Sequence, residues 1–166
     1  RPRYMRTLLV PMAGRSSRFP DLRPKWQLTH PMTNRFMVTE AILGLNLDFF
    51  DNIYFICLQE HEDKYHFTKG FVSELDELGL REKSNIVLLK EQTSSQSETV
   101  YTFLSGQELE GFVFIKDSDG FYRCDVEERN QVAYFDLNDM DNINAKSKSY
   151  VELDINNVLT NIVEKK

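Results

Sequence analysis

Four short, mostly apolar runs that alternate with helix-like segments most constrain what this chain can fold into. The runs span residues 7–11, 53–58, 86–89 and 112–115. Successive apolar residues are typical of strands in a parallel sheet covered on both faces, whereas a strand with one face in water alternates apolar and polar residues. The runs therefore predict buried strands in an α/β fold.

Helical spacing of apolar residues marks the segments between these runs. The predicted helices span residues 36–45, 60–78 and 96–108. Three consecutive strand–helix units give a parallel sheet with helices on both faces. We therefore expect a Rossmann-like three-layer sandwich.

The pattern changes after residue 120, where strand-like segments follow one another without a long helix. These strands are predicted over residues 131–135, 149–153 and 158–163. The acidic, Asn-rich residues 136–144 are predicted as an exposed loop. An antiparallel part is thus added, and the expected sheet is mixed but mostly parallel.

The length of 166 residues fits a single compact domain, which we expect to span residues 1–166. Met5 resembles a native start, so residues 1–4 are interpreted as an addition to it. No apolar run approaches the roughly 20 residues of a membrane span, and no secretory leader is recognised. Cys57 and Cys124 lack metal-ligand spacing. Reduced thiols in a cytoplasmic protein are predicted, with a disulfide as the alternative.

Positive charge is concentrated at the beginning of the chain. Residues 1–35 carry eight Lys and Arg residues against one acid, within a chain whose formal net charge is -6. Nonspecific binding of duplex nucleic acid needs a broad basic face, which an otherwise acidic protein lacks. A local cationic segment suits a small polyphosphate instead. The alternative is a solvated basic tail, which is the preferred interpretation for Arg1 and Arg3.

The cationic segment includes the loop that follows the first predicted strand. Ligands of open parallel sheets bind beyond the carboxyl ends of the strands, where this loop begins. Gly14, followed by Ser16 and Ser17, lets backbone N–H groups approach phosphate oxygens. Arg18 offers a bidentate fork to a phosphate and Lys25 a point charge. A surface turn with solvated cations is the alternative.

Residues 11–19 and the pair Pro24-Lys25 resemble the signature of the sugar-phosphate nucleotidylyltransferases, P-A-A-G-x-G-[ST]-R-F followed by P-K. Ser16 replaces the second glycine of that pattern. The resemblance implies that Arg18 and Lys25 are catalytic and neutralise phosphate charge around the reacting phosphorus. It also implies a set of nucleotide-binding residues, namely Pro11, Met12, Ala13, Gly14, Arg15, Ser16 and Ser17.

A second match lies at residues 93–100, which resemble the family's T-x-G-Q-x-E-T-V. The resemblance implies that Gln96 and Thr99 bind the nucleotide, while Ser95 stands in place of a glycine. The alternative is a capping box in which Ser95 and Glu98 stabilise the start of a helix. Both hold together if the capped helix also points free N–H groups at a ligand.

A third match follows the fourth strand, where Asp117 and Asp119 lie two positions apart. Mg²⁺ commonly takes one or two carboxylates together with phosphate oxygens. The resemblance to the family's N-x-D motif implies that Asp119 binds Mg²⁺, with Asp117 in the place of the asparagine. An Asx turn is the alternative.

The last match is at residues 158–166, which resemble the family's strand ending in E-K-P, with Lys166 in place of the proline. The resemblance implies that Glu164 and Lys165 approach the sugar phosphate. Members of the family continue past this strand, so we expect a chain truncated at its C-terminus. Such a chain is expected to bind a nucleoside triphosphate but to transfer it poorly. Its exposed sheet is expected either to self-associate, giving a homo-oligomer, or to be covered by a partner.

The predicted function is Mg²⁺-dependent transfer of a nucleoside monophosphate from a nucleoside triphosphate to a sugar phosphate, with release of pyrophosphate. Such a cytoplasmic enzyme would serve nucleotide-sugar and polysaccharide biosynthesis, with no nucleic acid or membrane as partner. One alternative is a metal-dependent glycosyltransferase, because Asp117 and Asp119 also form a D-x-D motif. Another is a degenerate nucleotide-binding domain, which Ser16 and Ser95 favour. Trp26 is predicted to serve packing.

Overall fold

The computed structural model describes residues 3–14, 23–136, 138 and 148–163. It divides into two compact units, Arg1–Glu128 and Arg129–Lys166. The expectation of one domain over residues 1–166 stays a prediction.

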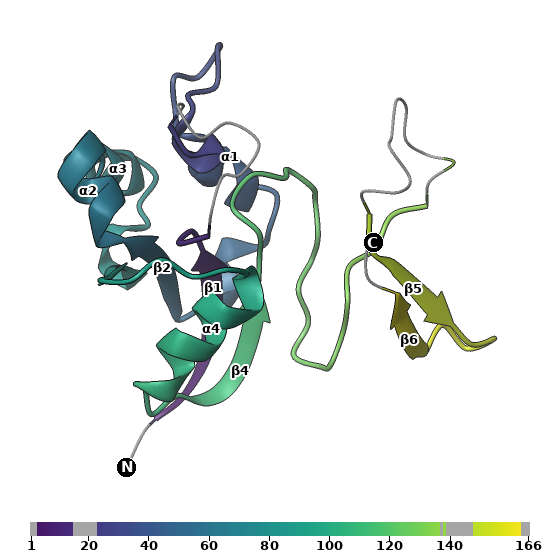
Figure 1. Ribbon diagram of the computed structural model, residues 1–166. Coiled ribbons are helices and arrows are strands. Elements are labelled where there is room, and N and C mark those ends of the chain that lie inside the picture. The colour runs from purple at the N-terminus through teal and green to yellow at the C-terminus, as the bar shows by residue number, and fades with distance from the viewer. Residues whose placement is uncertain (1–2, 15–22, 137, 139–147, 164–166) are drawn as a thin grey trace. The chain divides into compact units, whose positions relative to one another are not determined.

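The first unit is built on a four-stranded, entirely parallel sheet (Figure 1). Its strands are β1 (Tyr4–Pro11), β2 (Asn52–Leu58), β3 (Ser84–Leu89) and β4 (Glu110–Ile115). The spatial order is β3-β2-β1-β4, so β1 pairs with both β2 and β4. Leu8 lies opposite Ile53 on one side and Phe114 on the other. All four strands predicted from apolar runs are confirmed.

In the part of this unit that the structure describes, four α-helices connect or precede these strands: α1 (Met37–Ile42), α2 (Gln59–Tyr65), α3 (Thr68–Glu77) and α4 (Gln96–Ser105). The same residues also form three short 3-10 helices, namely η1 (Lys25–Gln27), η2 (Leu47–Phe49) and η3 (Arg81–Lys83). The first and last predicted helices are confirmed with shorter bounds.

The prediction of one helix over residues 60–78 is wrong, because this segment forms both α2 and α3. His66 ends α2 in the left-handed conformation, with φ 50°. The Glu62 carboxylate then accepts a hydrogen bond of 2.9 Å from the Thr68 backbone N–H and another from the Thr68 hydroxyl. These bonds satisfy a backbone donor that the first turn of α3 leaves without a helical partner. The stripe of apolar residues runs through both helices and conceals the break.

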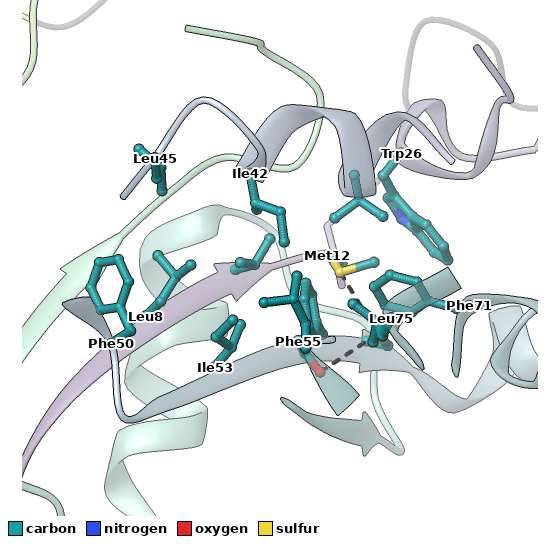
Figure 2. Packing of buried hydrophobic residues seen from close by; sticks show 14 of the residues in the cluster. Leu8, Met12, Trp26, Ile42, Leu45, Phe50, Ile53, Phe55, Phe71 and Leu75 are labelled. Carbon is teal, nitrogen blue, oxygen red and sulfur yellow. Dashed lines mark hydrogen bonds between the residues drawn. The ribbon is translucent and has the colours of Figure 1, made fainter. Parts of the chain in front are cut away.

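Alternation of side chains along the strands divides the core between the two faces of the sheet. Leu8 and Val10 pack with Ile42 of α1 and Phe71 of α3, in the cluster drawn in Figure 2. Leu9 points the other way and packs with Val100 of α4. Helices thus cover both faces, and the predicted three-layer α/β fold is confirmed.

The second unit contains an antiparallel pair of strands, β5 (Tyr150–Leu153) and β6 (Leu159–Val163). The turn between them is held by Asp154, whose Oδ1 accepts hydrogen bonds from the backbone N–H groups of Asn156 (2.8 Å) and Val158 (2.9 Å). Both strands were predicted, and both are confirmed.

The strand predicted over residues 131–135 is wrong, because these residues belong to no strand. A strand forms where a neighbouring strand completes its backbone hydrogen bonds, and the apolar residues of one segment do not specify that neighbour. Of the loop predicted over residues 136–144, only residues 136 and 138 are described.

The longest described α-helices have 10 residues. Among the described residues, no helix is long and apolar enough to cross a membrane. Cys57 and Cys124 are both free thiols, and burial raises the pKa of the Cys57 thiol far above its usual range.

Candidate functional site

Beyond the end of β1, the chain runs beside the segment that leads into α4. The Met12 N–H donates to the Ile56 carbonyl at 2.8 Å, and Gly14 then forms a parallel bridge with Thr93. Pro11, Met12 and Ala13 are buried, whereas Gly14 is exposed. A Cβ atom on Gly14 would have no neighbour within 4 Å among the described residues. Of these predicted nucleotide-binding residues, Gly14 is therefore the one open to a ligand.

Several predicted site residues lie outside the described part of the chain. These residues are Arg15, Ser16, Ser17, Arg18, Glu164 and Lys165. Their assignments stay predictions.

Lys25 and Asp119, predicted from motifs 94 positions apart, meet in the structure. The Lys25 Nζ lies 3.9 Å from the Asp119 Oδ2, and their side chains are 45% and 42% exposed. An ion pair this open to water contributes about 0–1 kcal/mol to folding. A cation and a carboxylate are thus held near each other while both keep access to solvent and ligands.

Lys25 is followed in η1 by two buried residues, Trp26 and Gln27, which are 4% and 2% exposed. Trp26 packs edge-on against Phe67, with 4.7 Å between ring centroids, and lies 6.0 Å from the His61 ring. Trp26 therefore serves packing, as predicted. This packing anchors η1, the 3-10 helix that begins with Lys25.

Three buried polar atoms around η1 have no hydrogen-bond partner among the described residues: Trp26 Nε1, Gln27 Oε1 and His61 Nδ1. Burial lowers the pKa of His61, which keeps its imidazole neutral at pH 7. Packing of the Trp26 ring against Phe67 and His61 therefore holds η1 in place, without hydrogen bonds from these three atoms to described residues.

The start of α4 is capped by side chains. The Ser95 Oγ accepts a hydrogen bond of 3.1 Å from the Glu98 N–H. Glu98 returns to Ser94, accepting from its backbone N–H at 2.8 Å and from its hydroxyl. The predicted capping box thus forms with one change: Ser95 caps the helix as expected, but the Glu98 carboxylate bonds to Ser94, one residue before the cap. The hydrogen bonds from Ser94 hold the pKa of Glu98 below its usual value.

The two predicted nucleotide-binding residues of α4 differ in accessibility. Gln96 is exposed. Thr99 is fully buried, and its hydroxyl shares a hydrogen bond of 2.5 Å with the Thr93 hydroxyl. Thr99 therefore fastens the entry segment of α4 to the helix, whereas Gln96 is open to a ligand.

Replacing Ser95 with alanine is expected to lower the free energy of unfolding by about 1 kcal/mol, because the Glu98 N–H loses its cap. Urea unfolding followed by circular dichroism measures this loss. Ser97→Ala, a change at an exposed position of the same turn, is the matched control. Equal stability of the two variants would contradict the capping role of Ser95.

Lys116 occupies an unusual position for a lysine, directly after β4. Its backbone N–H donates to the Leu9 carbonyl at 3.0 Å, and the residue is 0% exposed. Its Nζ donates to the Asp117 carbonyl at 3.1 Å, to the Asp117 carboxylate and to the Gly120 carbonyl. It also lies 4.4 Å from the centre of the Tyr122 ring.

The Tyr122 ring contacts this ammonium group. Burial, followed by the negative charge of Asp117, raises the pKa of Tyr122 to about 12. The phenol is therefore neutral at physiological pH and presents an uncharged ring to Lys116.

Lys116 has no role among the residues predicted from the sequence, although one signal for its burial was present. Phe112, Phe114 and Lys116 alternate in the sequence, and the first two pack into the core. The third therefore shares their inward direction. Val113 and Ile115, which alternate with them, are 37% and 48% exposed.

Comparison with known proteins finds no family model that matches this chain and no matching curated protein. The arrangement of Gly14, Lys25 and Asp119 therefore carries the functional argument. These residues offer an open backbone, a cation and a carboxylate, the groups that a metal-bound polyphosphate needs.

Proposed function

We propose that this chain carries the nucleotide-binding part of a sugar-phosphate nucleotidylyltransferase. One observation carries the proposal: the Lys25 Nζ and the Asp119 Oδ2 lie 3.9 Å apart. The loop after β1 and the loop after β4 each supply one of the two charged groups. Ligands of parallel α/β sheets bind beyond the carboxyl ends of such strands.

The reaction is an attack by a sugar-phosphate oxygen on the α-phosphorus of a nucleoside triphosphate. The bond between the α-phosphorus and its bridging oxygen breaks, and pyrophosphate leaves. No protein nucleophile takes part, so catalysis rests on positioning and on stabilising the negative charge of the transition state. Lys25 supplies that charge stabilisation, together with Arg18 by the family resemblance.

Asp119 suits Mg²⁺ because its carboxylate is 42% exposed and its ion pair with Lys25 is 3.9 Å long. No cluster of three or more His, Cys, Asp or Glu side chains able to hold a metal occurs among the described residues. Mg²⁺ does not require one, since it commonly uses one or two carboxylates with phosphate oxygens and water. When bound, Mg²⁺ neutralises charge on the phosphates.

A glycosyltransferase that uses a D-x-D motif is the second candidate. The position of Asp117 argues against this candidate, because the Asp117 carboxylate accepts a hydrogen bond from the buried Lys116 ammonium. Only Asp119 of the pair faces Lys25 at the surface. A degenerate nucleotide-binding domain is the third candidate, favoured by the serines at positions 16 and 95.

Pyrophosphate release tests the proposal, measured with each of four nucleoside triphosphates against a panel of sugar phosphates. Release that requires both substrates and Mg²⁺ is expected. Release of a nucleoside diphosphate from a sugar nucleotide would instead support the glycosyltransferase. Tight triphosphate binding without any product would support the degenerate domain.

We place this activity in the cytoplasm, where nucleoside triphosphates are available and the free thiols Cys57 and Cys124 stay reduced. Fractionation of cells tests this placement, and recovery outside the cytoplasm would contradict it. Nucleic acids and membranes are not among the proposed partners. Self-association is proposed through β4, the edge strand that exposes Val113 and Ile115. A monomer in sedimentation at high concentration would rule it out.

A further inference from the structure

We propose that the buried Lys116 is a positioning residue, which takes Asp117 as its counter-ion and so leaves Asp119 as the single carboxylate of the motif for Mg²⁺ and phosphate. The inference rests on the proposed function, because it assigns different roles to the two carboxylates of that site.

The burial of Lys116 is the first reason. Lysine is almost never fully buried unless its ammonium is paired, and Lys116 is 0% exposed. Removing an ammonium from water is costly, and well-packed apolar residues commonly replace buried ion pairs without loss of stability. Phe112 and Phe114 already provide apolar groups at the preceding inward positions. Stability alone therefore does not explain why a charged residue occupies position 116.

The second reason is that every donor of the ammonium group is used. An ammonium has three N–H groups, and three acceptors receive them: the Asp117 carbonyl, the Asp117 carboxylate and the Gly120 carbonyl. The Tyr122 ring adds a cation–π contact at 4.4 Å. Lys116 therefore fixes both ends of the turn that carries Asp119.

Gly120 provides an independent reason. A Cβ atom at this position would lie 2.9 Å from the Asp117 Oδ2, closer than two such atoms approach in proteins. Glycine therefore leaves room for the Asp117 carboxylate to lie against the turn. With Asp117 held there, Asp119 lies 3.9 Å from the Lys25 Nζ.

The same geometry predicts what happens without the ammonium. Once Lys116 is replaced, Asp117 loses its counter-ion and adds an uncompensated negative charge beside the phosphates. The added charge repels the anion, and the turn loses three hydrogen bonds. Removing the charge of Asp117 as well should then restore binding, which loss of structure alone would not do.

The experiment measures Mg²⁺-dependent binding of inorganic triphosphate by calorimetry, well below the unfolding temperature of each variant. Lys116→Met is expected to weaken binding by about tenfold to a hundredfold, the effect of losing a group that orients a metal ligand. The double variant Lys116→Met/Asp117→Asn is expected to recover most of the affinity. Lys116→Met with wild-type affinity, or a double variant as weak as the single one, would overturn the inference.

Two further variants keep the test decisive. If Lys116→Met does not fold, Gly120→Ala pushes the Asp117 carboxylate away from the turn while retaining both charges, and a smaller weakening of binding is expected. Wild-type affinity in Gly120→Ala would then overturn the inference. Asp119→Ala separates the two proposals: if the wild type binds no triphosphate with Mg²⁺, the proposed function fails. If binding depends on Asp119 but not on Lys116, only the inference fails.

Discussion

Replacing Lys25 with alanine is expected to slow nucleotidyl transfer by about 10²–10³-fold, the usual effect of removing one group that stabilises transition-state charge. The loss should fall on kcat, because charge on the transferring phosphate develops mainly as the bond to pyrophosphate breaks. A sensitive assay with radiolabelled nucleotide measures both kcat and KM.

The fold of the Lys25→Ala variant should remain intact. Its side chain is 45% exposed, and its ion pair with Asp119 is long, so little stability depends on it. The neighbours Trp26 and Gln27, not Lys25, are buried in the core. Lys69→Ala, a change of an exposed lysine on α3, is the control. A kcat equal to that of this control would remove Lys25 from the site.

Replacing Asp119 with alanine is expected to abolish the Mg²⁺-dependent part of triphosphate binding. Removing a residue that hydrogen-bonds to a metal ligand typically lowers metal affinity by about 10–100-fold. Removing the ligand itself should lower it at least as much. Calorimetry with and without Mg²⁺ measures that part directly.

Asp117→Asn is the comparison for Asp119→Ala, because an amide oxygen still accepts a hydrogen bond from Lys116. Most of the Mg²⁺-dependent affinity should remain in this variant. A greater loss from Asp117→Asn than from Asp119→Ala would reverse the assignment. Equal wild-type affinity with and without Mg²⁺ would refute metal binding by either carboxylate.

The strands were predictable because each contains a continuous apolar run. Both faces of β1 and β2 are largely buried, whereas β4 lies at an edge of the sheet and exposes Val113 and Ile115. The break at His66 was not predictable, because it depends on a left-handed residue other than glycine and on the cap that Glu62 gives to Thr68. Neither feature disturbs the apolar stripe that predicted a single helix. The strand predicted over residues 131–135 was wrong for another reason: the segment is mostly apolar, but whether it joins a sheet depends on a partner strand elsewhere in the chain.

The candidate site was predictable where a motif and a charge coincide. Lys25 and Asp119 were predicted separately, and the structure brings them within 3.9 Å. Thr99 shows the limit of a motif, because its hydroxyl bonds to Thr93 inside the protein. Lys116 was overlooked because a lysine ordinarily indicates solvent, and only its place in the alternation of β4 indicates the core.

The strand order β3-β2-β1-β4 also has a consequence for how the site is assembled. The chain winds outward from β1 to β3 and then reverses direction, so β4 joins β1 across a topological switch point, where crevices form in such sheets. Pairing of Tyr4 with Glu110 closes a loop of more than a hundred residues, which carries a larger entropy cost than the β1–β2 or β2–β3 pairings. Lys25 follows β1 in the chain and Asp119 follows β4, so the pairing of these two strands brings the two residues together. A ligand that needs both residues therefore binds only chains in which β4 has joined the sheet, and by mass action it stabilises this most distant pairing.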